Sequence, residues 1–111
     1  MAKELKFVML LDCYGDLLTE HQRSVMEMYY CEDLSLAEIG APMGITRQAV
    51  MNLIKRTEGI LTNYEEKLGF AERLEKMRDC FDAIGTTISK IADDKLRFEL
   101  TEKINNAIKL I

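Results

Sequence analysis

The sequence predicts an all-α protein in which a helix-turn-helix domain is followed by long C-terminal helices. Three observations carry this prediction. The 111 residues are rich in types that favour helices, only one of them is Pro, and apolar side chains recur every three or four positions. Hydrophobic residues make up 48% of the chain, enough for a packed core, which argues against disorder.

The first expected helix runs from about Lys3 to Asp16 and presents one wide apolar face. That face consists of Phe7, Leu10, Leu11, Tyr14, Leu17 and Leu18. The apolar run from Phe7 to Leu11 is too short for a signal peptide or a membrane span. We therefore expect a cytoplasmic protein that has no membrane partner.

The second expected helix begins at Thr19 and ends near Cys31. Thr19 and Gln22 have the spacing of a capping box, in which each side chain satisfies a free N–H group at the start of the helix. The inner stripe expected for this helix is Val25, Met28 and Tyr29.

A helix-turn-helix is expected directly afterwards. Ser35 and Glu38 form a second capping box that opens a short helix, and Gly44 supplies the turn because Gly tolerates left-handed backbone geometry. Thr46 then caps a further helix that continues to about Leu68. Its core-facing residues are expected to be Ala49, Val50, Leu53, Ile54, Thr57 and Leu61.

The two helices of this motif must cross at a steep angle, which requires small residues at the contact. Gly40 on the first helix and Ala49 on the second meet that requirement. Pro42 lies in the same short helix and predicts that it ends early or kinks, since Pro lacks a backbone N–H. Such a change would alter how the second helix is presented.

The outer face of the second motif helix is the candidate DNA-binding site, with the residues Thr46, Arg47, Gln48, Met51, Asn52, Lys55 and Arg56. Arg and Gln can each form paired hydrogen bonds to base edges, and Asn can read adenine. The helix N-terminus can hold a phosphate. Residues 46–57 contain three Lys/Arg and no acid, so this helix is locally basic.

A blander alternative stays open for the same residues. Arg47 and Gln48 can form an ordinary solvated face, and Lys55 and Arg56 can pair with Glu58 or other acids. Residues 19–68 carry five Lys/Arg and eight Asp/Glu, and the whole chain has a net charge of −4. Because non-specific DNA binding depends on neutralising phosphates, this acidic module argues against a strong general DNA binder and keeps a protein partner open.

Three segments resemble region 4 of bacterial sigma factors: LTEHQR (18–23), LSLAEIG (34–40) and GITRQAV (44–50). With MLLDCYGDLLT at 9–19 and IKRTE at 54–58, the chain resembles the YlxM family of small bacterial helix-turn-helix proteins. The resemblance implies a regulatory role linked to the signal recognition particle pathway, with components of that particle as candidate partners and no enzymatic activity. It also implies that Thr46, Arg47, Gln48, Met51, Asn52 and Lys55 face DNA.

The C-terminal third, residues 69–111, is expected to be a helical extension of a domain formed by residues 1–68. It opens with a heptad-like apolar seam, Phe70, Leu74, Met77, Phe81, Ile84, Ile88 and Ile91. The seam either folds back to close a monomeric core or pairs with a second chain. We favour a homodimer with this seam as its interface, because the seam is long and a helix-turn-helix commonly reads paired half-sites.

Gly85 and Asp93 bear on where the helices of this C-terminal third begin and end. Gly85 lies in the middle of the seam and argues against one unbroken helix. Asp93 is expected to cap a last helix. The apolar face of that helix is Leu96, Leu100, Ile104, Ala107, Ile108 and Ile111.

No residue pattern points to an enzyme, a cofactor or a metal. The three cysteines, Cys13, Cys31 and Cys80, are far apart and form no Cys-x-x-Cys pair, so free thiols are expected. The one histidine, His21, has no second His or Cys at ligand spacing and cannot complete a catalytic set. We therefore expect a non-enzymatic protein that needs neither metal nor cofactor.

Overall fold

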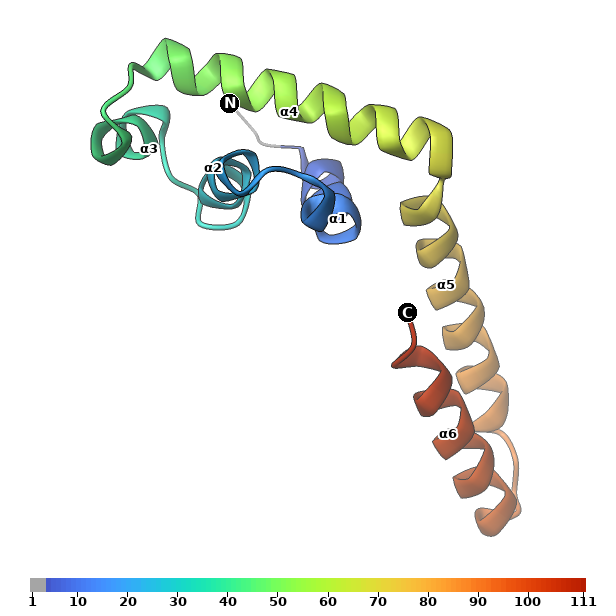
Figure 1. The fold of residues 1–111 in the computed structure, drawn as a ribbon. Coiled ribbons are helices and arrows are strands. Elements are labelled where there is room, and N and C mark those ends of the chain that lie inside the picture. The colour runs from blue at the N-terminus through green and yellow to red at the C-terminus, as the bar shows by residue number, and fades with distance from the viewer. Residues whose placement is uncertain (1–3) are drawn as a thin grey trace. The chain divides into compact units, whose positions relative to one another are not determined.

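A computed structural model describes residues 4–111, which form six α-helices and one short 3-10 helix without any strand (Figure 1). The all-α prediction is thus confirmed. The helix start expected at Lys3 lies outside the described residues. The elements are α1 (Leu5–Tyr14), η1 (Gly15–Leu17), α2 (Glu20–Tyr30), α3 (Leu36–Met43), α4 (Arg47–Leu68), α5 (Phe70–Ile88) and α6 (Asp94–Ile108).

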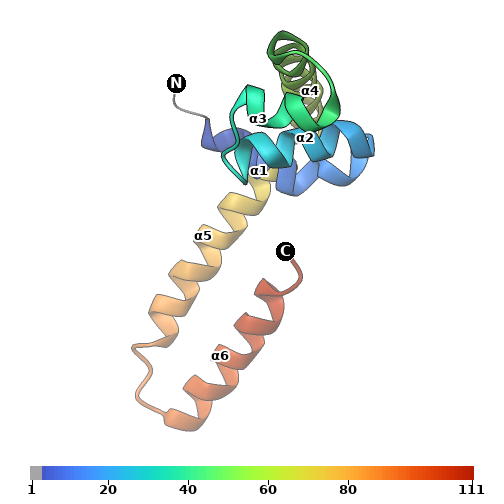
Figure 2. The ribbon, with the colours of Figure 1, turned by 90° about the vertical axis from the view of Figure 1, so that its left-hand side faces the viewer.

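The chain forms two compact units, Met1–Ala71 and Glu72–Ile111. In the first unit α4 is the long element, with α1, α2 and α3 packed along one side of it (Figures 1 and 2). At 1.5 Å per residue its 22 residues span about 33 Å. One helix can therefore contact all three of the others.

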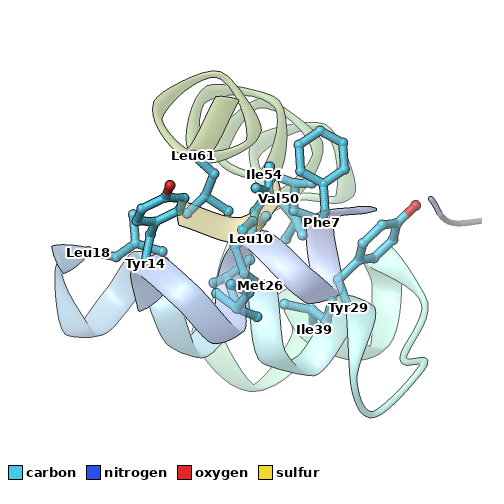
Figure 3. Packing of buried hydrophobic residues seen from close by; sticks show 13 residues of the cluster. Phe7, Leu10, Tyr14, Leu18, Met26, Tyr29, Ile39, Val50, Ile54 and Leu61 are labelled. Atoms are coloured by element: carbon cyan, nitrogen blue, oxygen red, sulfur yellow. The ribbon is translucent and has the colours of Figure 1, made fainter. Parts of the chain in front are cut away.

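The core of the first unit lies between α4 and these three helices. In Figure 3 the side chains of Val50, Ile54 and Leu61 point from α4 into the space between the helices. The fully buried side chains are Val25, Met26, Ile39, Val50, Ile54, Thr57 and Leu61. The whole core cluster comes from residues 7–71, so the first unit has a hydrophobic core of its own.

Both predicted capping boxes are present. The Thr19 hydroxyl accepts a hydrogen bond from the Gln22 N–H at 3.2 Å, and the Ser35 hydroxyl accepts one from the Glu38 N–H at 3.1 Å. In each box the side chain of the later residue accepts a hydrogen bond from the backbone N–H of the cap residue. Such caps contribute on the order of 1 kcal/mol each.

The predicted apolar face of the first helix is wrong at Leu17, which is 58% exposed. The α-helix ends at Tyr14, and residues 15–17 form a tighter 3-10 turn with three residues per turn. That winding rotates Leu17 away from the buried face. On α2, Met26 is fully buried although it lies outside the predicted stripe, because α2 packs against α1, α3 and α4 and buries a wider surface.

The early end of α3 predicted from Pro42 is also wrong, because α3 continues to Met43. Pro42 lies in the last turn of a short helix, where its missing N–H costs a single helical hydrogen bond. Beyond it, the Gly44 N–H donates to the carbonyl oxygens of Gly40 and Ala41. These bonds close the end of the helix in spite of the proline.

In the second unit α5 and α6 run antiparallel as a helical hairpin joined by residues 89–93 (Figures 1 and 2). The Asp93 carboxylate accepts a hydrogen bond from the Leu96 N–H at 3.0 Å and caps α6 as predicted. The break expected at Gly85 is absent, since α5 runs to Ile88. Among residues 72–111, Ile88 is the single buried side chain, so this unit has almost no core.

Candidate nucleic-acid interface

The turn between α3 and α4 brings the two helices close together. Gly44 has a φ of 69°, in the left-handed region that favours Gly, and the Ile45 N–H donates to the Gly40 carbonyl oxygen at 3.1 Å. A Cβ atom on Gly40 would lie 2.6 Å from the Ile45 carbonyl oxygen and 3.3 Å from Cγ2 of Val50. Position 40 therefore has room only for Gly, and the predicted role of this small residue is confirmed by geometry.

The N-termini of α3 and α4 border one surface hollow. It is lined by Ser35, Leu36 and Ala37 from α3 and by Thr46, Arg47, Gln48 and Met51 from α4. The Thr46 hydroxyl accepts a hydrogen bond from the Ala49 N–H at 3.1 Å and caps α4. The remaining free N–H groups of the first turn and the helix dipole make this end attractive to an anion.

The first turn of α4 also lacks an acidic residue, as does that of α1. In contrast, Glu20, Glu38, Glu72 and Asp94 occupy the first turns of α2, α3, α5 and α6. An acid in the first turn offsets the positive end of the helix dipole. At α4 that positive end is left open, and Arg47 adds a full positive charge beside it.

The predicted site residues lie on the solvent side of α4, with Thr46, Arg47, Gln48, Asn52, Lys55 and Arg56 exposed and Met51 half-buried. The Gln48 side-chain N–H donates to the Asn52 Oδ1 at 3.0 Å, one helical turn away. This contact orders two side chains that are able to read base edges. The hollow is lined by Thr46, Arg47, Gln48 and Met51, whereas Asn52, Lys55 and Arg56 lie further along the helix.

The cations of this face are not neutralised within the part of the chain that the structure describes. Arg47, Lys55 and Arg56 form no ion pair with residues 4–111, whereas Arg23 pairs with Asp16 at 2.7 Å and with Glu27 at 2.9 Å. Glu58 instead accepts a hydrogen bond from the Tyr30 hydroxyl at 2.9 Å. The pairing of Lys55 or Arg56 with Glu58, which the sequence left open, is therefore absent.

Two buried or half-buried tyrosines hold α4 in place. The Tyr30 hydroxyl of α2 donates to Glu58, and the Tyr14 hydroxyl of α1 donates to Glu65 at 2.5 Å. Burial, reinforced by the neighbouring carboxylate, raises the pKa of both tyrosine hydroxyls above the ordinary value of 10.0. Both phenols are therefore protonated donors at neutral pH and help to fix which face of α4 is turned outward.

Glu65 and Tyr14 also secure the start of α5. Glu65 Oε1 accepts a hydrogen bond from the Ala71 N–H at 3.0 Å, and the Tyr14 hydroxyl accepts one from the Phe70 N–H at 3.1 Å. Sequence reasoning missed this group, because Tyr14 lies 51 positions from Glu65 and 56 positions from Phe70, and such distant contacts carry no local signal. It also missed the contribution of α3 to the hollow, for which the Ser35 capping box was the available signal.

Among residues 4–111 no group of three or more His, Cys, Asp or Glu side chains is placed to hold a metal ion. None of the helices in this part of the chain is long and apolar enough to cross a membrane.

The comparison with known proteins decides the family. Residues 1–101 match the model of the family UPF0122, described as "Putative helix-turn-helix protein, YlxM / p13 like". The chain belongs to this family. The resemblance inferred from the sequence is thus confirmed, and the helix-turn-helix of α3 and α4 is the motif for which the family is described.

Relatives in this family resemble the chain over most of its length. The UPF0122 protein of Clostridium kluyveri is 41% identical over 108 residues, covering 97% of this chain and 96% of the relative. That of Halalkalibacterium halodurans is 39% identical over 105 residues, covering 95% and 96%. That of Desulforamulus reducens is 52% identical over 71 residues, covering 64% and 61%.

Proposed function

We propose that this UPF0122 protein is a regulatory DNA-binding protein that reads duplex DNA with α4 and acts as a homodimer. The observation that carries the proposal is a set of cations, Arg47, Lys55 and Arg56, that form no ion pair within residues 4–111. They lie on the exposed side of a helix whose opposite side is buried in the core. An α-helix fits the major groove of DNA, and exposed cations on it meet the phosphates that border the groove.

The residues of α4 divide into two roles in this proposal. Arg47 and Gln48 read base edges, with Asn52 held by Gln48 as a third reading group. The N-terminus of α4 at Thr46 binds a phosphate, and Lys55 and Arg56 contact the backbone further along. Met51 supplies an apolar contact beside them.

The proposal includes a homodimer, with the seam Phe70, Leu74, Met77, Phe81, Ile84, Ile88 and Ile91 as its starting point. Two copies would present two α4 helices to paired half-sites. The scarcity of buried side chains in residues 72–111 supports a partner for this unit, because an isolated pair of helices without a core is marginally stable. The protein acts where DNA is found, which in a bacterium is the cytoplasm, and carries out no catalysis.

The test of DNA binding is a gel-shift experiment with sheared chromosomal DNA from a bacterium that carries the gene. We expect a shift at micromolar protein in low salt, and Arg47→Ala weakens it by about tenfold, since a good base contact contributes ~1–3 kcal/mol. Arg23→Ala is the matched control: it removes the same charge from a cation that is already ion-paired. Absence of any shift, or equal loss in both variants, contradicts the proposal.

Salt dependence separates phosphate contacts from base contacts. The logarithm of the affinity falls linearly with the logarithm of salt concentration, with a slope of about −0.9 for each phosphate neutralised on duplex DNA. Lys55→Ala should reduce the magnitude of that slope by about 1 and weaken all sequences alike. Gln48→Ala should leave the slope unchanged and relax the preference for the bound sequence.

The charge of the first unit favours a second candidate function. Residues 1–71 carry seven Lys/Arg and eleven Asp/Glu, which disfavours DNA and suits a protein surface. In this alternative the protein is an interaction module of the signal recognition particle machinery that binds no DNA. A pull-down with the particle's GTPase, its receptor and its RNA tests it, and failure to retain all three contradicts it.

A further inference from the structure

The hairpin of α5 and α6 has two unlike sides. One side carries a groove lined by Ala83, Ile84, Thr87, Ile88, Ile91, Leu100, Lys103, Ile104 and Ala107, in which Thr87 and Lys103 are the only polar side chains. The hollow on the other side is lined by Phe81, Asp82, Gly85, Thr86, Ile88, Ser89, Thr101, Ile104, Asn105 and Ile108, of which five are polar. The first side is therefore the more apolar of the two, and we name it the apolar hairpin face.

The apolar hairpin face extends beyond the groove along both helices. On α5, Cys80 and Met77 lie about one and two helical turns before Ile84, and on α6 Leu96 lies one turn before Leu100. Met77, Ile84 and Leu96 are 42%, 45% and 46% exposed. Several large apolar side chains on one side of a short hairpin form an exposed patch that normally marks an interaction surface.

The predicted seam is divided between two environments. Phe81 lines the hollow shared with Thr101 and Ile104 of α6, and Ile88 lines both that hollow and the groove of the apolar hairpin face. Met77 and Ile84 remain exposed on the apolar hairpin face. A coiled coil formed by two copies of α5 alone would leave out Leu96 and Leu100, which α6 contributes to the same face.

We propose that the apolar hairpin face is covered by the same face of a second copy of this chain, so that two hairpins form a four-helix bundle. The inference rests on the proposed homodimer and names its interface. In a two-fold symmetric dimer one patch must complement itself. Two layers of Ile, Leu, Met and Ala side chains do so, because residues from both α5 and α6 would then fill the centre of a bundle.

Charge and size favour a second copy over another occupant. Residues 72–111 carry eight Lys/Arg and eight Asp/Glu, so two hairpins approach without net repulsion. In contrast, residues 1–71 have four more acids than bases. A stable interface buries about 800 Å² per partner, and the apolar hairpin face runs along two helices of 19 and 15 residues, the longer of which spans about 28 Å.

Thiol reactivity tests the face without DNA and in the unmodified protein. Cys80 lies on the apolar hairpin face and Cys31 lies in the first unit, and both are exposed in the single chain. As sedimentation shows the protein passing from monomer to dimer, the labelling rate of Cys80 with a maleimide should fall at least tenfold. The rate of Cys31 should stay within twofold and serves as the internal control.

Substitutions give an independent measurement. Ile84→Lys and Thr87→Lys place a charge on the apolar hairpin face, and both should leave a monomer at concentrations where the natural protein is a dimer. Phe98→Lys is the matched control, because Phe98 is 71% exposed but lines the other side of the hairpin with Ser89 and Thr101. Circular dichroism checks that each variant keeps its helix content. If Ile84→Lys does not fold, Thr87→Lys alone tests the apolar hairpin face.

The outcomes separate this inference from the proposed function. The assigned face is wrong if the protein is a dimer and Cys80 still reacts with maleimide at the monomer's rate. It is also wrong if Phe98→Lys dissociates the dimer and Thr87→Lys does not. In both cases the homodimer itself stands. A protein that remains monomeric up to about 100 µM, well above the micromolar dissociation constants of ordinary specific complexes, overturns both the face and the homodimer. Binding of DNA by α4 is measured separately in the gel-shift experiment.

Discussion

Gly40→Ala should destabilise the first unit because α3 and α4 meet at Gly40. The added Cβ atom would lie 2.6 Å from the Ile45 carbonyl oxygen, a backbone atom that cannot move without disturbing the turn. Overpacking of this kind costs typically 1–3 kcal/mol. The better helix propensity of Ala offsets about 1 kcal/mol, so the centre of that range leaves a net loss of about 1 kcal/mol in the free energy of unfolding.

Gly59→Ala is the matched substitution for this measurement. Gly59 lies in the interior of α4, and a Cβ atom there would meet nothing within 4 Å. Ala should therefore raise the free energy of unfolding by about 0.5–1 kcal/mol through helix propensity alone. Urea denaturation followed by circular dichroism measures both variants. Equal effects of the two substitutions, or a Gly40→Ala variant as stable as the natural protein, would refute the steric argument.

Three further substitutions probe the core, the α4 cap and the tyrosine contacts. Leu61→Ala removes a fully buried side chain and should lower the free energy of unfolding by about 2–5 kcal/mol in urea denaturation; a loss well under 1 kcal/mol would contradict its place in the core. Thr46→Ala removes the α4 cap and should cost ~1 kcal/mol, and an unchanged denaturation midpoint would show that the cap is not formed. Because the folded state raises the pKa of Tyr30 above 10.0, the stability it provides is complete below pH 10 and is lost as pH rises further. Denaturation between pH 9 and pH 12 should show this fall, Tyr30→Phe should reduce its slope, and an unchanged slope would speak against the Tyr30–Glu58 contact.

Local interactions explain what was predictable. The capping boxes at Thr19 and Ser35 and the left-handed turn at Gly44 involve residues no more than four positions apart. Their hydrogen bonds join near neighbours in the sequence, so the residue types and their spacing are enough to suggest them. For that reason the helix-turn-helix, the start of α4 and the candidate residues on its outer face could be found before any packing was known.

Pro42 and Leu17 show where local reasoning fails. Pro42 removes one helical hydrogen bond, and because α3 ends one residue later there is no further turn of helix for it to disrupt. The burial of Leu17 depends on whether the backbone winds as an α-helix or as a 3-10 helix after Tyr14, a choice that packing between α1 and α2 influences. Neither outcome is visible in residue spacing.

By itself, then, the sequence determined the helices, their caps and the side of α4 that faces solvent, because these follow from periodicity and short-range hydrogen bonds. Only the tertiary structure decided which charges are free. Tyr30 lies 28 positions from Glu58 and donates a hydrogen bond to its carboxylate, and within residues 4–111 Arg47, Lys55 and Arg56 form no ion pair. The structure likewise showed that the residues of the seam lie in two environments, because α6 packs on one side of α5 and leaves the apolar hairpin face uncovered.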